Sequence, residues 1–212
     1  MNAFRISELI LLFALGPMVL LLGILPKPWV LYLILAGIPI TIWLVLHRKN
    51  TWSDFWSGPR EGGYQTEFVR ILSRFGINAI GIVVLTFVWF PEKLLLFPQE
   101  FPFRWLAVMV LYPFFMVYPQ ELFFRMFFVE RYGDLLVSKK WVIVVSAILF
   151  GWAHILFGNW TAVLLSGVGG VLLMDTFLRT RSMKLVCIEH ALYGNLIFTI
   201  GLGEFFYSGW AG

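Results

Sequence analysis

The chain has 212 residues, of which 60% are hydrophobic and 13% are charged, and its formal net charge is +4. Soluble domains average roughly 45–50% apolar and about 25% charged residues, so this composition excludes an ordinary soluble enzyme and predicts an integral membrane protein. The basic residues are scattered among connectors, which argues against nucleic acid as a partner. The single cysteine, Cys187, excludes an intrachain disulfide.

Seven apolar runs follow one another along the chain, and each has roughly the 17–25 residues that a spanning helix needs. They cover approximately residues 9–25, 29–46, 76–91, 105–129, 141–157, 160–178 and 184–202. The first run is too long for the apolar region of a signal peptide and has no small-residue cleavage site before Lys27, so we interpret it as a spanning helix. The sequence therefore predicts an all-α, polytopic transmembrane helix bundle that forms a single membrane domain over residues 1–212.

Positive charge is unequally divided between the two sides of this bundle. With a cytoplasmic N-terminus, the inside segments carry twelve Lys and Arg residues, and the outside segments carry only Lys27, Lys93 and Arg104. The positive-inside rule then predicts an N-in, C-out topology. Residues 66–75 follow a polar loop, and we expect them to form a short amphipathic helix on the cytoplasmic surface.

Ionisable side chains within the runs are the candidates for function, because a charge at the bilayer centre costs roughly 2.5–3.5 kcal/mol. They are Glu121, Arg125, His154, Asp175, Glu189 and His190, with the polar Asn195 beside them. Glu121 and Arg125 are four residues apart and face the same side of a helix, so a purely structural ion pair is one interpretation of them. For His154, a hydrogen-bonded packing residue is the alternative.

These side chains together suit the hydrolysis of a peptide bond. A carboxylate beside a neutral imidazole can deprotonate a water, and a second imidazole or an amide can donate hydrogen bonds to the oxyanion that forms. Two histidines and a carboxylate also match a hydrolytic zinc site. We rank zinc second, because the sequence has no His-Glu-x-x-His pair on one helix.

Three motifs follow one another on the later runs: Gln120-Glu-Leu-Phe-Phe-Arg125, Phe150-Gly-Trp-Ala-His154 and His190-Ala-Leu-Tyr-Gly-Asn195. They resemble the Glu-Glu-x-x-x-Arg, Phe-x-x-x-His and His-x-x-x-Asn signatures of the intramembrane glutamic proteases of the CAAX-processing and bacteriocin-processing type. The resemblance covers about residues 112–207, which it marks as the family-like catalytic core.

The resemblance implies roles for the motif residues. In such enzymes the first glutamate and the first histidine activate water, and the second histidine and the asparagine form the oxyanion site. This sequence has Gln120 in place of that glutamate and Gly194 in place of that asparagine. The missing groups follow one residue later, so our hypothesis makes Glu121 the base and His154 its partner. The proposed oxyanion donors are His190 and Asn195, and the supporting residues are Gln120 and Arg125.

The leading prediction is therefore an intramembrane endopeptidase of a bacterial inner membrane. It would cut a membrane-associated or lipidated protein or peptide, with no metal or organic cofactor. The main alternative is a non-catalytic relative that acts as a scaffold or regulator of a membrane partner, and Gln120 and Gly194 favour it. A transporter is a third interpretation, since a proline-broken helix and buried ionisable groups also mark substrate paths, but the sequence has no inverted repeat.

Overall fold

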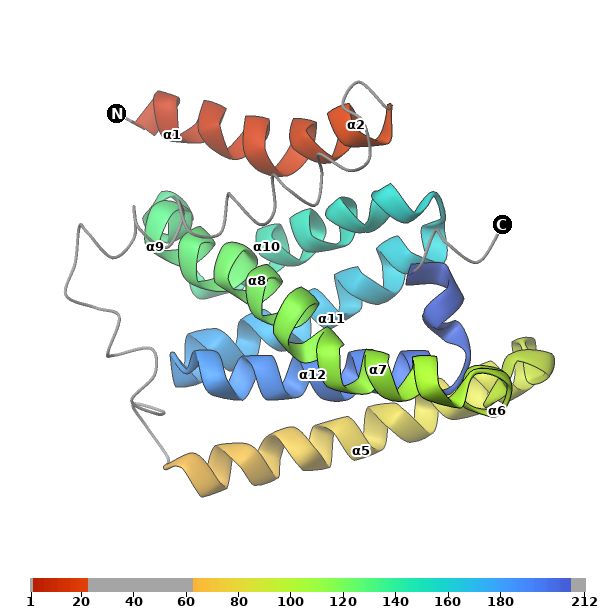
Figure 1. Cartoon of the computed structure of the whole chain (residues 1–212). Coiled ribbons are helices and arrows are strands. Elements are labelled where there is room, and N and C mark those ends of the chain that lie inside the picture. The colour runs from red at the N-terminus through yellow and green to blue at the C-terminus, as the bar shows by residue number, and fades with distance from the viewer. Residues whose placement is uncertain (1, 23–62, 207–212) are drawn as a thin grey trace.

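The computed structural model describes residues 2–22 and 63–206, and their regular structure is helical throughout (Figure 1). The N-terminal helix consists of α1 (Asn2–Leu9), a π-helical segment (Ile10–Leu15) and α2 (Gly16–Leu21). The helices that follow residue 62 are α5 (Tyr64–Trp89), α6 (Leu96–Glu100), α7 (Pro102–Tyr112), α8 (Tyr118–Glu121), α9 (Phe128–Tyr132), α10 (Lys139–Ala153), α11 (Trp160–Thr180) and α12 (Met183–Thr199).

Five helices in the described residues are long and apolar enough to cross a membrane. They cover Ala3–Leu21, Tyr64–Trp89, Pro102–Leu135, Lys139–Phe157 and Trp160–Thr180. Each lies on one of the predicted runs, so an all-α chain with several helices long and apolar enough to span a membrane is confirmed. The predicted run 29–46 lies outside the described residues. The last predicted run forms α12, whose 17 residues give a length of about 25 Å, a little less than a hydrocarbon core.

The predicted surface helix over residues 66–75 does not exist as a separate element. Those residues are the first turns of α5, which continues without a break to Trp89. The polar turns can continue into an apolar helix because their charged side chains find partners: Glu67 binds Arg179, and Arg74 binds Glu189.

The fourth predicted run is one long helix whose direction changes between α7 and α8 (Figure 1). Pro113 opens a π-helical segment, Pro113–Val117, and a second such segment covers Leu122–Phe127. Proline has no backbone N–H and its ring clashes with the preceding turn, so a helix that contains it widens or bends there. The bend places the end of α7 and the start of α8 against α12.

The N-terminal helix packs on α9, α10 and the segment that follows α10. Phe13, which is fully buried, stacks on Phe123 at a centroid distance of 4.5 Å and meets Phe124 and Tyr132 edge to face.

The helices α10 and α11 approach each other closely because small residues face each other. A Cβ at Gly170 would lie 2.9 Å from the Cα of Ala147, which shows how little space separates the two backbones.

Polar groups lie inside the bundle and apolar groups cover much of its outside. Side chains of α5 such as Ile77 and Ile80 are 73% and 68% exposed, whereas Glu121, Arg125 and Glu189 are fully buried. This distribution is expected when lipid rather than water surrounds the helices, because charged side chains then face the bundle interior and pair there.

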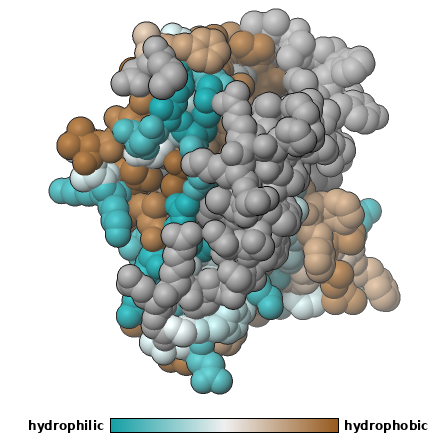
Figure 2. Space-filling view, turned by 90° about the vertical axis from the view of Figure 1, so that its left-hand side faces the viewer, coloured by the Kyte–Doolittle hydropathy of each residue, from teal (hydrophilic) through white to brown (hydrophobic). Residues whose placement is uncertain are grey.

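Hydrophilic side chains are visible on the end of the molecule where α1 begins (Figure 2). Ion pairs join the elements that meet near this end: Arg131 binds Glu8 at 2.7 Å, and Arg5 pairs with Asp134. In Figure 1 the last described residues lie at the opposite end of the bundle. The N-in, C-out topology stays a prediction.

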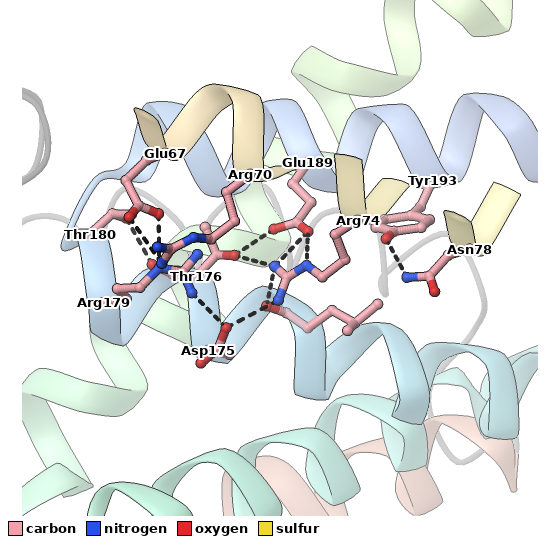
Figure 3. A network of polar contacts seen from close by, with 11 residues as sticks. Glu67, Arg70, Arg74, Asn78, Asp175, Thr176, Arg179, Thr180, Glu189 and Tyr193 are labelled. Atoms are coloured by element: carbon pink, nitrogen blue, oxygen red, sulfur yellow. Dashed lines mark hydrogen bonds and ion pairs between the residues drawn. The ribbon is translucent and has the colours of Figure 1, made fainter. Parts of the chain in front are cut away.

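A network of charged side chains ties α5 to α11 and α12 (Figure 3). Arg74 of α5 donates to the Glu189 carboxylate of α12 at 2.7 and 3.1 Å and to Asp175 of α11 at 3.0 Å. Thr176 donates to the second Glu189 oxygen at 2.6 Å, and Arg179 binds Asp175 at 2.8 Å. Three helices are therefore held together by one buried carboxylate and its partners.

The topology can be tested with single cysteines in a Cys187→Ser background. A membrane-impermeant maleimide added to intact cells should label Glu92→Cys, which follows the predicted third span, and should not label Lys139→Cys. Labelling of Lys139→Cys alone would show the inverted topology.

The network predicts unequal effects for two arginines of α5. Arg74→Met leaves the buried Glu189 carboxylate without its main partner, and breaking such a pair costs about 3–5 kcal/mol. Arg70, whose side chain is 52% exposed, serves as the matched control, because an exposed pair contributes only about 0–1 kcal/mol. Thermal unfolding in one detergent should show a much larger loss for Arg74→Met, and equal losses would contradict the role of the network.

Candidate active site

A cavity of about 1000 Å³ lies among α7, α8, α10, α11 and α12. Most of its lining is apolar, with aromatic side chains such as Phe115, Phe157 and Phe198. The polar side chains of the lining include Tyr112, Gln120, His154, Ser166, His190 and Tyr193. An apolar cavity with a few polar groups is the usual form of a site for a small or lipid-like ligand.

Glu121, the last residue of α8, lies behind the polar side of the cavity, where it contacts the lining residue His190. Its Oε1 accepts a hydrogen bond from Nδ1 of His190 at 2.7 Å, and its Oε2 lies 3.2 Å from Nε of Arg125. The carboxylate and the guanidinium are both fully buried. The predicted pair of Glu121 and Arg125 therefore exists, and the structure adds His190 to it.

Arg125 is held by groups of its own helix and of α10. Its Nη1 donates to Ser146 Oγ and to the carbonyl oxygen of Phe124, each at 3.3 Å. The guanidinium carbon lies 4.5 Å from the centroid of the Phe150 ring, a distance that favours a cation–π contact. Arg125 thus balances the charge of Glu121 inside the bundle and fixes its orientation.

These contacts assign the protons on His190. Beside the guanidinium, Glu121 is a carboxylate, which only accepts hydrogen bonds. Nδ1 of His190 is then the donor, and when the imidazole is neutral its Nε2 is left as an acceptor. His190 lines the cavity, so a molecule bound there can reach this nitrogen by displacing the Tyr112 hydroxyl, which lies 3.2 Å from it.

His154 is oriented by its own helix. Its Nδ1 lies 2.7 Å from the carbonyl oxygen of Phe150, one turn earlier. A carbonyl oxygen cannot donate, so Nδ1 carries the proton and Nε2 is again an acceptor. The Phe150 ring packs against both imidazoles, with centroid distances of 4.8 Å to His154 and 5.7 Å to His190. Phe150 therefore positions the two histidines on the same cavity.

The other predicted site residues lie in different surroundings. Gln120 lines the cavity, and its Oε1 is buried with no hydrogen-bond partner in the described part of the chain. Asn195 donates to the carbonyl oxygen of Met109 at 3.4 Å, and the cavity lining does not include it. The structure thus brings Glu121, Arg125 and His190 into contact and places His154 and Gln120 on the same cavity.

Tyr112 belongs to this site although the sequence analysis did not select it. Its hydroxyl lies 3.2 Å from Nε2 of His190, and since that nitrogen is an acceptor, the hydroxyl is the donor. A Tyr-Pro pair within an apolar run was the only signal in the sequence, and Tyr118 before Pro119 gives the same signal. Only the structure distinguishes the two tyrosines.

The zinc alternative predicted from two histidines and a carboxylate needs a cluster of ligands. Among residues 2–22 and 63–206, no group of three or more His, Cys, Asp and Glu side chains is placed to hold a metal ion.

Residues 99–196 match the family model described as Rce1-like, type II CAAX prenyl endopeptidase Rce1-like. The matched stretch contains Glu121, His154, His190 and Asn195, and the match confirms the resemblance drawn from the three motifs. Searches among curated proteins and among solved structures found no match.

The packing at Gly194 predicts that a larger side chain at this position destabilises the protein. A Cβ there would lie 2.2 Å from Cε1 of Tyr112, whereas a Cβ at Gly169 of α11 would meet nothing within 4 Å. Gly194→Ala should therefore destabilise the protein by about 1–3 kcal/mol through overpacking. Gly169→Ala, the matched control, should be neutral or stabilise the helix by up to about 1 kcal/mol. Thermal unfolding of both variants checks this, and equal stabilities would contradict the position of Tyr112.

Proposed function

We propose that this chain, whose residues 99–196 form a domain of the Rce1-like family of type II CAAX prenyl endopeptidases, is an intramembrane endopeptidase. It hydrolyses a peptide bond of a membrane-associated or lipidated substrate. The observation that carries the proposal is the buried pair of Glu121 and His190, which presents an acceptor nitrogen to a largely apolar cavity.

The proposed reaction uses this pair to activate water. Nε2 of His190 takes a proton from the water, whose oxygen bonds to the carbonyl carbon while the π electrons move to the carbonyl oxygen. Glu121, hydrogen-bonded to Nδ1, orients the ring and stabilises the imidazolium that forms. The C–N bond then breaks, and the leaving nitrogen takes the proton from Nε2. His154 accepts a second hydrogen bond from the same water through its own Nε2.

This scheme keeps Glu121, His154 and His190 in the site but pairs Glu121 with His190 rather than with His154. The contacts support that pairing, because each oxygen of the Glu121 carboxylate lies against His190 or Arg125. The role of Asn195 as an oxyanion donor stays a prediction, and its amide contact with Met109 argues for a part in packing.

The cavity favours substrates that carry apolar groups. Its lining is mainly aromatic and aliphatic, so the transfer of a lipid chain or an apolar peptide segment into it costs little free energy. The family description names prenylated CAAX proteins as substrates of its members, and such a C-terminal tail is the first substrate class to try on this chain.

A non-catalytic role is the second candidate, and Gln120 favours it. Gln120 stands on the cavity wall at the position where the family has a glutamate, and an amide cannot accept a proton at neutral pH. In that case the cavity would hold a membrane partner or a lipidated peptide without cutting it.

The proposal can be tested by incubating the purified protein with a panel of farnesylated CAAX-type peptides and membrane-embedded peptides and measuring their cleavage. The wild type should cut at least one peptide, and Glu121→Gln and His190→Ala should each lower kcat by roughly 10²-fold or more. His154→Ala should lower kcat as well. Glu8→Gln is the matched control, because Glu8 also pairs with an arginine, Arg131, but lies away from the cavity.

The same panel separates the two candidates. A wild type without activity, together with cleavage by Gln120→Glu, would favour the non-catalytic role. Full activity in Glu121→Gln would refute the water-activating pair.

A further inference from the structure

Gly194 stands where the family motif has an asparagine, and the ring of Tyr112 occupies the space next to it. A Cβ built on Gly194 would lie 2.2 Å from Cε1 and 2.5 Å from the hydroxyl of Tyr112. Real Cβ atoms do not approach other atoms so closely, so a side chain at position 194 would displace the Tyr112 phenol from its present position. The phenol therefore fills the space where the family asparagine would begin.

The phenol is fixed in that space from several sides. Tyr112 ends α7, directly before the π-helical segment Pro113–Val117, so the bend of the helix sets its position. Its ring meets Phe198 at a centroid distance of 5.4 Å and His190 at 6.1 Å, both nearly edge to face. The phenol also lines the cavity, so its hydroxyl is within reach of a bound substrate.

We infer that the Tyr112 hydroxyl is the hydrogen-bond donor for the carbonyl oxygen of the scissile peptide bond, in the place of the side chain that Gly194 lacks. This inference rests on the proposed endopeptidase function. An amide and a phenol hydroxyl both donate hydrogen bonds, so the exchange preserves the chemistry while the donor comes from a different helix.

The protonation state of His190 determines which group accepts the hydrogen bond of the Tyr112 hydroxyl. Before reaction the hydroxyl donates to Nε2 of His190 over 3.2 Å, a long hydrogen bond that a bound water or carbonyl can displace. Once Nε2 has taken the proton of the attacking water, it no longer accepts and instead donates to the Tyr112 oxygen. The O–H of Tyr112 is then free to turn to the oxyanion, to which it donates without giving up its proton.

This role can be tested by measuring kcat and KM with the peptide that the wild type cleaves most efficiently. Tyr112→Phe removes only the hydroxyl, and loss of one oxyanion donor should lower kcat by about 10²-fold with little change in KM. Tyr132→Phe is the matched control, because Tyr132 is fully buried and lies outside the cavity lining. Its kcat should equal that of the wild type.

A side-chain exchange provides the second arm. Tyr112→Ala combined with Gly194→Asn opens the space and returns a donor to position 194, so kcat should rise about tenfold above that of Tyr112→Ala alone. Gly194→Asn alone, which meets the phenol, should lose both stability and activity. A double variant no better than Tyr112→Ala would overturn the exchange of donors.

A binding arm separates failure of this inference from failure of the proposed function. The probe is a fluorescent farnesylated peptide in which a ketone replaces the scissile amide. The wild type should bind it about tenfold more tightly than Tyr112→Phe. Cleavage by the wild type with unchanged kcat in Tyr112→Phe would overturn the inference alone. If the wild type cleaves nothing, the function is refuted, and equal binding of the ketone by both proteins would overturn the donor role as well.

Discussion

The burial of the Glu121 carboxylate is the constraint on which the arrangement of the site depends. A charge in a bundle that lipid surrounds is stable only with compensating partners, and Glu121 has two, Arg125 from its own helix and His190 from α12. Arg125 in turn is held by Ser146 and the Phe150 ring of α10. One carboxylate therefore ties α8 to α10 and α12, and the same contacts assign the proton on His190.

The rotation of α12 about its axis is fixed by two neighbouring residues. Glu189 and His190 point in directions about 100° apart, and each enters a different polar cluster, Glu189 with Arg74 of α5 and His190 with Glu121 of α8. Gly194 follows His190 by about one turn and so faces the same side, toward Tyr112. The charged network of Figure 3 thus helps to present His190 to the cavity, although no residue of that network other than Tyr193 lines it.

The two departures from the family motifs have different structural consequences. From the sequence, we assigned the roles of the missing glutamate and asparagine to the next residues along the chain, Glu121 and Asn195. On a helix one residue is about 100°, so the shifted groups meet other neighbours. Glu121 reaches His190 and still contributes to the site, whereas the Asn195 amide meets the carbonyl oxygen of Met109. At Gly194 the space is taken by a side chain from α7.

The sequence by itself determined the membrane class, the approximate positions of the long apolar helices and the set of ionisable residues within them, including the pair of Glu121 and Arg125. These follow from local hydrophobicity and from spacing along one helix, which a sequence displays directly. Only the tertiary structure decided which groups meet across helices. His190 lies 69 residues from Glu121 and 78 from Tyr112, and Arg74 lies 115 from Glu189. Such pairings depend on helix rotation and on the angle of the bend at Pro113. Proline marks a bend in the sequence but does not specify which helices the bend brings together.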